Sequence, residues 1–259
     1  MRLYPAIDRS AGWGLLAVCL LALALRWAQQ RHDPRRAPVL AAAPGAGVSA
    51  AVAVVALGLF AALARQVVQP DPPAWLARLD GWMAAHPARL PEPLLARVAD
   101  FTQLGDVTTL TGVAVLAGLA LTWRRRWLAL AWWTLAVAGN GLLVRWTKQV
   151  FGRERPDAPY LEVHGYSFPS GHAMSSLVVY GLLCLMLWGW SPGAGDSRRA
   201  ARALALVLAV LIAAVGCSRI ALQVHYASDV LAGWLLGLGW LALVGLLARP
   251  VRPVRAAAV

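Results

Sequence analysis

The chain has 259 residues, of which 59% are hydrophobic and 14% are charged. A soluble globular domain carries about 25% charged residues, so this composition excludes an ordinary soluble protein and indicates an integral membrane protein. The net charge of +12 does not indicate a nucleic-acid partner, because the arginines fall in short links between apolar runs and form no continuous face. Cys19, Cys184 and Cys217 lie far apart in apolar runs, which argues against a disulfide framework and against a zinc site.

The first apolar run covers residues 13–27 and is followed by a link rich in arginine. We interpret this run as a membrane span or a membrane-embedded helix. An interfacial helix and the core of a signal sequence are the alternatives. Together with the basic link it forms an N-terminal membrane-associated segment, residues 1–47.

Six further runs approach the roughly 20 apolar residues that a helix needs to cross a bilayer. They cover residues 48–64, 107–122, 127–146, 172–190, 203–217 and 227–247. The predicted fold is therefore all-α, a polytopic bundle of six core transmembrane helices in one membrane domain, residues 48–247, followed by a basic tail, residues 248–259. The link 66–106 contains prolines and tryptophans, so we expect one or two short amphipathic helices there, at the level of the lipid headgroups.

Arginines are concentrated in alternate links along the chain. They precede the run at 48–64, separate the runs at 107–122 and 127–146, precede the run at 203–217 and fill the tail. By the positive-inside rule these four segments are cytoplasmic. The remaining links, residues 66–106, 148–171 and 218–226, then all face outward. We expect a multi-pass protein of the plasma or inner membrane, with these three links at the periplasmic or exterior face.

The first of three polar clusters begins at Lys148, the only lysine among the 24 Lys and Arg residues. Arg155, in an Arg-Pro pair, follows seven residues later. A guanidinium fork and a lysine point charge both suit phosphate oxygens. Two cations that merely reach lipid headgroups are the alternative, but cations on an outer link break the charge pattern and require a cause. Arg153 is a weaker candidate, with Glu154 or Asp157 as its expected partner.

The second cluster is Pro169-Ser170-Gly171-His172, directly before an apolar run. Ser170 is a good N-cap, Gly171 allows a ligand to approach the backbone, and the free N–H groups of a helix start bind anions. His172 lies beside cations at this helix start, which disfavours its protonated form and helps it to donate a proton as a general acid. The simpler reading is an ordinary helix start.

The third cluster contains Ser218-Arg219, His225 and Asp229. The i, i+4 spacing of the last two places them on one face of a helix. The carboxylate can then accept one imidazole N–H and leave the other nitrogen free for nucleophilic or base chemistry. A helix-start aspartate beside an interfacial histidine is the simpler reading, and the nearby Arg219 favours the functional one.

These clusters resemble the signature of the type 2 phosphatidic acid phosphatase/haloperoxidase superfamily. In that signature a Lys precedes Arg-Pro by seven residues, Pro-Ser-Gly-His follows, and Ser-Arg comes before a His and an Asp. The resemblance covers residues 48–247, and within this range it includes the segment 101–106, which resembles the segment that enters the family's next helix. It implies a helical bundle that lipid enters laterally, and a metal-independent phosphatase that works through a phosphohistidine and needs no cofactor.

The resemblance also implies residue roles. His225 is the nucleophile, Asp229 orients it, and His172 protonates the leaving oxygen. The implied substrate-binding residues are Lys148, Arg155, Ser170, Gly171 and Arg219.

The expected function is hydrolysis of a lipid phosphate or diphosphate at the outer face. Undecaprenyl diphosphate, phosphatidate and phosphatidylglycerophosphate are the candidate substrates. A phosphotransferase that uses the same phosphohistidine is the alternative within enzymes, whereas a haloperoxidase is disfavoured because those relatives are soluble. A non-catalytic scaffold or transporter is disfavoured by the intact His172, His225 and Asp229. The expected partners are the phosphorylated lipid and the bilayer, with no nucleic acid, and the oligomeric state stays open.

Overall fold

The structure is a computed structural model that describes residues 17–18, 20–22, 24–25, 45–85, 90–157, 159–190 and 196–249. Within these residues the regular elements are helices and no strand occurs, which confirms the all-α class. The elements are α2 (Ala46–Val67), α3 (Ala74–Ala85), α4 (Glu92–Thr102), the short 3₁₀ helix η2 (Gln103–Gly105), α5 (Val107–Trp123), α6 (Trp127–Phe151), α7 (Gly171–Trp190), α8 (Asp196–Ala221) and α9 (Ala227–Leu247).

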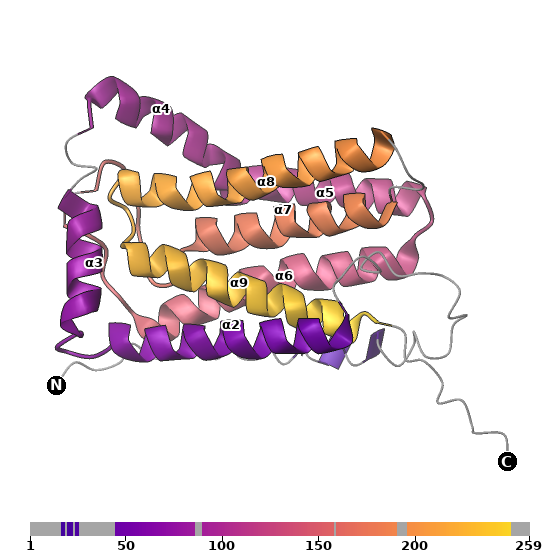
Figure 1. Cartoon of the computed structure of the whole chain (residues 1–259), viewed down its shortest axis with the longest axis horizontal. Helices are drawn as coiled ribbons and strands as arrows, with labels where there is room; N and C mark the ends of the chain where they lie inside the picture. Colours follow the sequence, from indigo (N-terminus) through magenta and orange to yellow (C-terminus); the bar gives the residue numbers. More distant parts are fainter. Residues whose placement is uncertain are drawn as a thin grey trace, which may run out of the picture.

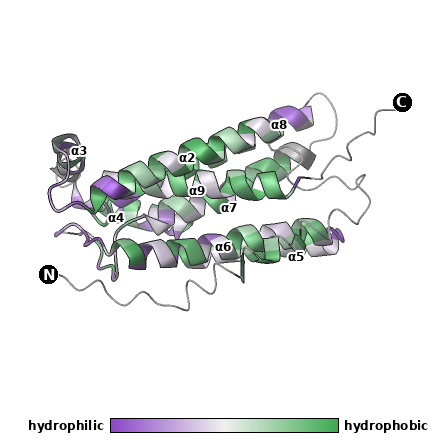
Figure 2. Ribbon diagram, turned by 90° about the horizontal axis from the view of Figure 1, so that it is seen from below, coloured by the Kyte–Doolittle hydropathy of each residue, from purple (hydrophilic) through white to green (hydrophobic). Residues whose placement is uncertain are grey.

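Each of the six predicted apolar runs forms a helix, and the long helices run side by side (Figure 1). In the described part of the chain, five helical stretches are long and apolar enough to cross a membrane, and α7 adds a shorter apolar helix over Gly171–Leu187. Most residues of these helices are hydrophobic (Figure 2), and many of their large apolar side chains are exposed. Val54 of α2 and Leu116 of α5, for example, are 73% and 69% exposed. Such surfaces suit a hydrocarbon environment, so the chain is a multi-span membrane protein.

Most of residues 1–47 and of the tail 248–259 lie outside the described residues, and so does most of the run 13–27. The division into an N-terminal segment, a membrane domain and a tail therefore stays a prediction.

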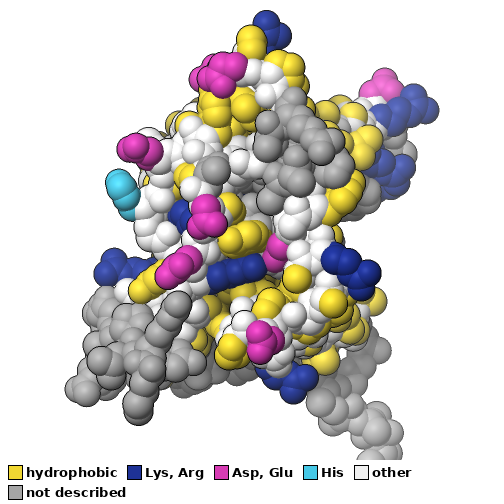
Figure 3. All heavy atoms as spheres, turned by 90° about the vertical axis from the view of Figure 1, so that its left-hand side faces the viewer, with side chains coloured by type: hydrophobic (Ala, Val, Ile, Leu, Met, Phe, Trp, Pro, Cys, Tyr) yellow, Lys and Arg dark blue, Asp and Glu magenta, His cyan; other side chains and the backbone are white. Residues whose placement is uncertain are grey.

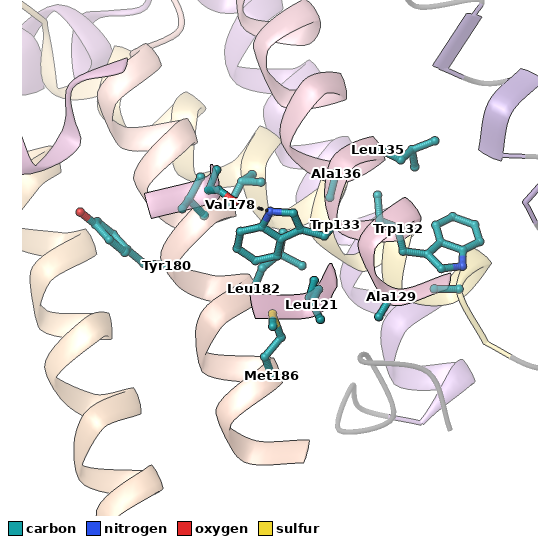
Figure 4. Close-up of a cluster of buried hydrophobic side chains, with 14 of the residues drawn as sticks. Leu121, Ala129, Trp132, Trp133, Leu135, Ala136, Val178, Tyr180, Leu182 and Met186 are labelled. Carbon is teal, nitrogen blue, oxygen red and sulfur yellow. Dashed lines mark hydrogen bonds between the residues drawn. The ribbon is translucent and has the colours of Figure 1, made fainter. Parts of the chain in front are cut away.

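The bundle interior is held by packed hydrophobic side chains (Figure 4) and by indole hydrogen bonds to carbonyl groups of neighbouring helices. Trp133 of α6 donates Nε1–H to the carbonyl of Ala114 at 3.0 Å, and Trp240 of α9 donates to the carbonyl of Ala136 at 2.9 Å. A carbonyl that already closes the helix ladder can accept a second hydrogen bond, which satisfies the buried indole. These contacts fix α5, α6 and α9 relative to one another.

The start of α7 lies directly against α9. A Cβ atom on Gly233 would be only 2.6 Å from the carbonyl oxygen of Ser170, so this crossing requires a glycine. The backbone N–H of Ser170 also donates to the carbonyl of Asp229 at 2.9 Å. The second and third polar clusters are thereby joined through their main chains.

The link 66–106 contains two short helices, α3 and α4, as expected. α3 stands across the end of the bundle (Figure 1). Its Leu76 is buried with Leu63 of α2 and with Phe168, while Trp75 and Trp82 are 49% and 58% exposed. α3 is thus docked on the bundle by one face and presents aromatic side chains on another.

Candidate active site

The three polar clusters meet at one end of the bundle, on the left in Figure 1. This is the end where α6 and α8 finish and where α7 and α9 begin. Figure 3 looks onto this end, where basic side chains lie among hydrophobic ones. The prediction that one face carries all three clusters is therefore matched by the arrangement of the helices.

His225 and Asp229 are paired by the turn that starts α9. Tyr226 is extended and is the N-cap, and Asp229 lies in the first turn of the helix. Its Oδ2 accepts the backbone N–H of Tyr226 at 3.0 Å and lies 3.4 Å from Nδ1 of His225. Because His225 precedes the helix, the expectation that the two residues share a helix face is wrong. A side chain that reaches back to cap the helix start brings them together instead.

The other imidazole nitrogen of His225 faces a cation. Its Nε2 lies 3.4 Å from Nη1 of Arg155. Burial lowers the pKa of His225 to about 4, and the charges of Lys148 and Arg155 act in the same direction, while Asp229 opposes them. The ring is therefore neutral at neutral pH. With Nδ1–H directed to the carboxylate, Nε2 carries the lone pair.

Lys148 and Arg155 are held beside each other by one backbone carbonyl. α6 ends at Gly152, whose φ of 56° is left-handed and whose N–H donates to the carbonyl of Lys148 at 3.0 Å. The chain then turns so that Lys148 Nζ and Arg155 Nη2 both donate to the carbonyl oxygen of Tyr166. Arg155 Nη1 also donates to the carbonyl of Val224 at 2.6 Å. These contacts hold two cations next to His225.

Two buried polar atoms of the predicted substrate-binding set, Ser170 Oγ and Arg219 Nε, have no hydrogen-bond partner among the residues that the structure describes. Ser170 was expected to cap α7 with its side chain, but only its carbonyl closes the first turn, accepting from Met174 N–H at 3.1 Å. Its hydroxyl is thus available to a ligand. An unpaired buried donor is costly, and an oxyanion is a ligand that both donors can bind.

Ser170 is itself anchored by its neighbour Phe168. This ring is fully buried, stacks on Phe60 of α2 at 6.0 Å and meets Phe151 of α6 edge-on at 5.1 Å. The loop that delivers Ser170 and Gly171 therefore has little freedom to move.

His172 lies at the start of α7 and faces a carboxylate of the neighbouring helix. Its Nε2 is 3.9 Å from Oδ1 of Asp106, which caps α5 by accepting Thr108 N–H at 2.9 Å. The groups that act electrostatically on His172 are Arg219, His225, Asp106 and Lys148. The imidazole therefore lies within the same cluster of charges as His225.

The structure adds residues that the sequence did not single out. Thr102 accepts a hydrogen bond from Arg219 Nη1 at 3.0 Å and one from Ser218 Oγ at 2.8 Å. Thr102 and Asp106 belong to the segment 101–106, which the family resemblance included without assigning roles to its residues. Their proximity to Arg219 and His172 depends on the packing of η2 against α7 and α8, which no local spacing indicates.

Arg153 also belongs to the site. Its Nη1 donates to Asp229 Oδ1 at 2.6 Å, and its Nη2 donates to Asp80 Oδ2 at 2.9 Å. Its ion pairs are thus with Asp229 and Asp80, and the expected pairing with Glu154 or Asp157 is wrong. Although burial opposes the effect, these carboxylates raise the pKa of Arg153 above its ordinary value.

The family model described as the PAP2 superfamily matches residues 129–250, which include all three clusters. The chain belongs to the PAP2 superfamily. The matched residues include His172, His225 and Asp229, whereas Thr102 and Asp106 of the same site lie before the matched part.

Relatives of this PAP2 chain include named phosphatases. Phosphatidylglycerophosphatase B of Bacillus subtilis (strain 168) is 35% identical over 139 residues, which are 53% of this chain and 66% of that protein. Undecaprenyl-diphosphatase of Sulfolobus acidocaldarius is 34% identical over 94 residues, which are 35% of this chain and 37% of that protein. The matched part thus spans less than two thirds of the length of either relative.

The fold is also similar to a solved PAP2 structure. The crystal structure of the first transmembrane PAP2 type phosphatidylglycerolphosphate phosphatase from Bacillus subtilis superimposes with a TM-score of 0.66 at 27% identity. The similarity covers 74% of this chain and 93% of that one. The helical arrangement that gathers the clusters is therefore shared with a relative.

The unpaired donors of Ser170 and Arg219, together with the adjacent cations, predict binding of a tetrahedral oxyanion. Orthovanadate or inorganic phosphate should raise the melting temperature of the detergent-solubilised protein. A ligand at about 100 times its Kd adds about 2.7 kcal/mol to the free energy of unfolding. Arg219→Gln should lose most of the shift, whereas Arg97→Gln, at an exposed position of α4, should keep it. An equal shift in the Arg219 variant would contradict the assignment.

Proposed function

We propose that the protein is a membrane-embedded, metal-independent phosphatase that cleaves a lipid phosphate or diphosphate through a phosphohistidine. The observation that carries the proposal is the placement of His225. One ring nitrogen faces the buried Asp229 carboxylate at 3.4 Å, and the other faces the Arg155 guanidinium at 3.4 Å. A nucleophilic histidine needs a group that orients its ring and stabilises the imidazolium, and the phosphoryl group that it attacks needs cations. Asp229 and Arg155 are placed to supply these two functions. The named relatives of this PAP2 chain support the same class of substrate.

In the first step, the Nε2 lone pair of His225 attacks phosphorus while the bond from phosphorus to the lipid oxygen breaks. The imidazolium that forms keeps its Nδ1–H directed to Asp229 Oδ2. His172 donates its proton to the departing oxygen, since the leaving group would otherwise carry the full negative charge. The non-bridging oxygens are held by Lys148, Arg155, Ser170, the Gly171 N–H and Arg219, which stabilise the charge of the phosphoryl group.

In the second step, water attacks the phosphohistidine. His172, now neutral, accepts a proton from the water as the bond from phosphorus to Nε2 breaks. Inorganic phosphate leaves and His225 returns to its neutral form. The same two side chains therefore serve both halves of the reaction, with His172 acting first as acid and then as base.

The proposal is tested with purified protein in detergent containing EDTA. Phosphatidate, phosphatidylglycerophosphate and undecaprenyl diphosphate are offered, and release of inorganic phosphate is measured. We expect release from at least one lipid, and a fall of roughly a thousand-fold or more in His225→Ala, because the nucleophile is lost. His164→Ala, at an exposed position of the outer loop, is the matched control and should retain activity. Full activity in His225→Ala, or dependence of wild-type activity on an added metal, would contradict the mechanism.

Transfer of the phosphoryl group to a second lipid is the alternative outcome for the same phosphohistidine. An added lipid alcohol in the assay distinguishes the two reactions. Hydrolysis predicts that phosphate release exceeds formation of phosphorylated acceptor, and a phosphotransferase predicts the reverse.

We further propose that the site faces the periplasm or exterior of a plasma or inner membrane. The support is the concentration of arginine in the links at the opposite end of the bundle, such as Arg124, Arg125 and Arg126. A reporter that is active only in the cytoplasm should then be active when it is fused after Val259, and a reporter that is active only outside the cytoplasm should be inactive there. Activity of a secreted-type reporter at that position would reverse the orientation.

The buried environment of His225 predicts the acid limb of the pH profile. The free enzyme needs neutral His225, whose pKa is lowered to about 4. Activity, measured as kcat/KM, should therefore persist as the pH falls below 6.5 and be lost only as it approaches the lowered value. The profile is measured with a monoester and a diphosphate, and the pKa of each substrate is measured separately, because a limb caused by substrate ionisation follows that pKa whereas a limb caused by His225 does not. An acid limb at pH 6.5 with both substrates would contradict the prediction.

A further inference from the structure

Asp80 of α3 is a buried carboxylate that belongs to none of the three clusters. It is only 6% exposed, in a helix whose Trp75 and Trp82 are largely exposed. Leu76, one turn earlier, and Leu79 pack against hydrophobic clusters that include residues of α7, α8 and α9. Because the face of α3 that contains Leu76 and Leu79 packs against the bundle, the Asp80 carboxylate points toward the bundle. A buried charge is costly unless it is paired, so its partners are informative.

The partners of Asp80 all lie at the candidate active site. Its Oδ1 accepts the backbone N–H of Ser228 at 3.0 Å, and its Oδ2 accepts the Ser228 hydroxyl at 2.7 Å. Oδ2 also accepts Nη2–H of Arg153 at 2.9 Å. Asp80 thus caps the first turn of α9 from outside that helix and holds one edge of the Arg153 guanidinium.

The other edge of the guanidinium holds the carboxylate that faces His225. Arg153 Nη1 donates to Asp229 Oδ1 at 2.6 Å, and the guanidinium lies 4.1 Å above the Tyr226 ring. The two oxygens of Asp229 therefore have separate functions. Oδ1 is bound by Arg153, and Oδ2 is left to the Tyr226 N–H and to His225 Nδ1. Asp229 is fully buried, so these contacts alone decide its orientation.

We propose that Asp80 is a positioning residue that acts through Arg153 on Asp229, and thereby ties the docking of α3 to the orientation and basicity of the carboxylate serving His225. The inference rests on the proposed phosphatase function for its kinetic consequences. Among the described residues, the hydrogen bonds of Asp80 run to Arg153 and Ser228, so it acts on His225 only through these partners.

The charges predict opposite effects of removing Asp80 and removing Arg153. Without the Asp80 charge, the guanidinium attracts Asp229 alone, so this carboxylate accepts less strongly from His225 and stabilises the imidazolium less. Without Arg153, Asp229 Oδ1 loses its cation, and the carboxylate stabilises the imidazolium more. The other charged or titratable groups that face this pair remain in both variants; they are Lys148 of α6, Arg155 of the loop, His172 of α7, Arg219 of α8, Asp106 at the start of α5, and Tyr226.

The experiment compares Asp80→Asn, Arg153→Gln and the double variant with the wild type. We expect Asp80→Asn to lower kcat roughly ten-fold with KM little changed, because a misplaced Asp229 affects the chemical step and not lipid binding. The acid limb of kcat/KM should move to lower pH in Asp80→Asn and to higher pH in Arg153→Gln. The double variant should lose less than the product of the two single losses, since the two charges interact. Asp71→Asn, at an exposed position of the same link, is the control.

A titration of His225 by NMR separates this inference from the proposed function. Protein with isotope-labelled histidine is prepared in detergent, and the chemical shifts of its imidazole signals are measured as a function of pH. The signal that is missing in His225→Gln is assigned to His225. Shifts of the His225 pKa in opposite directions in the two single variants support the coupling, even in a preparation that releases no phosphate from any lipid. Absence of phosphate release would overturn only the proposed function.

A purely structural role for Asp80 gives a different pattern. In that case both single variants have a lower melting temperature and a lower kcat, while the pH profile and the His225 titration stay unchanged. That result would overturn the inference. Wild-type kcat in Asp80→Asn would overturn it as well.

Discussion

The site depends on keeping one carboxylate, Asp229, charged and fully buried at the end of a membrane helix. Burying a carboxylate costs several kcal/mol unless other groups replace its water. Here the replacements are the N–H of Tyr226, the Arg153 guanidinium and the imidazole of His225. Its position in the first turn of α9 adds a favourable helix dipole. Once these groups are in place, His225 has a single orientation.

Segments outside the recognised motifs supply the support for the motif residues. Asp80 of α3 holds Arg153 and Ser228, and Thr102 at the end of α4 holds Arg219. Asp106 at the start of α5 faces His172. The link between α2 and α5 therefore contributes to the candidate active site, because three of its polar side chains contact residues of that site.

The location of the candidate site is compatible with binding of a charged headgroup by a bundle of hydrophobic helices. Lys148 lies in the last turn of α6, Arg219 lies in the last turn of α8, and Arg155 follows α6, so all three cations are at the end of the bundle. A lipid whose chains lie against the exposed apolar surfaces would present its phosphate at this level. The charged residues are then placed near the interface, where they cost less than at the bilayer centre.

The sequence by itself determined the six apolar helices and identified the motif residues that meet at the bundle end, but not Asp80, Thr102 and Asp106, which join them there. Apolar length and arginine distribution are local properties, and the spacing of Lys148, Arg155, His172 and His225 is visible along the chain. Only the tertiary structure decided that Asp229 pairs with His225 through a capping turn, and that Arg153 bridges Asp229 to Asp80. The physical reason is that these pairings depend on where α3 docks and where α9 begins, and both are set by packing between segments far apart in the sequence.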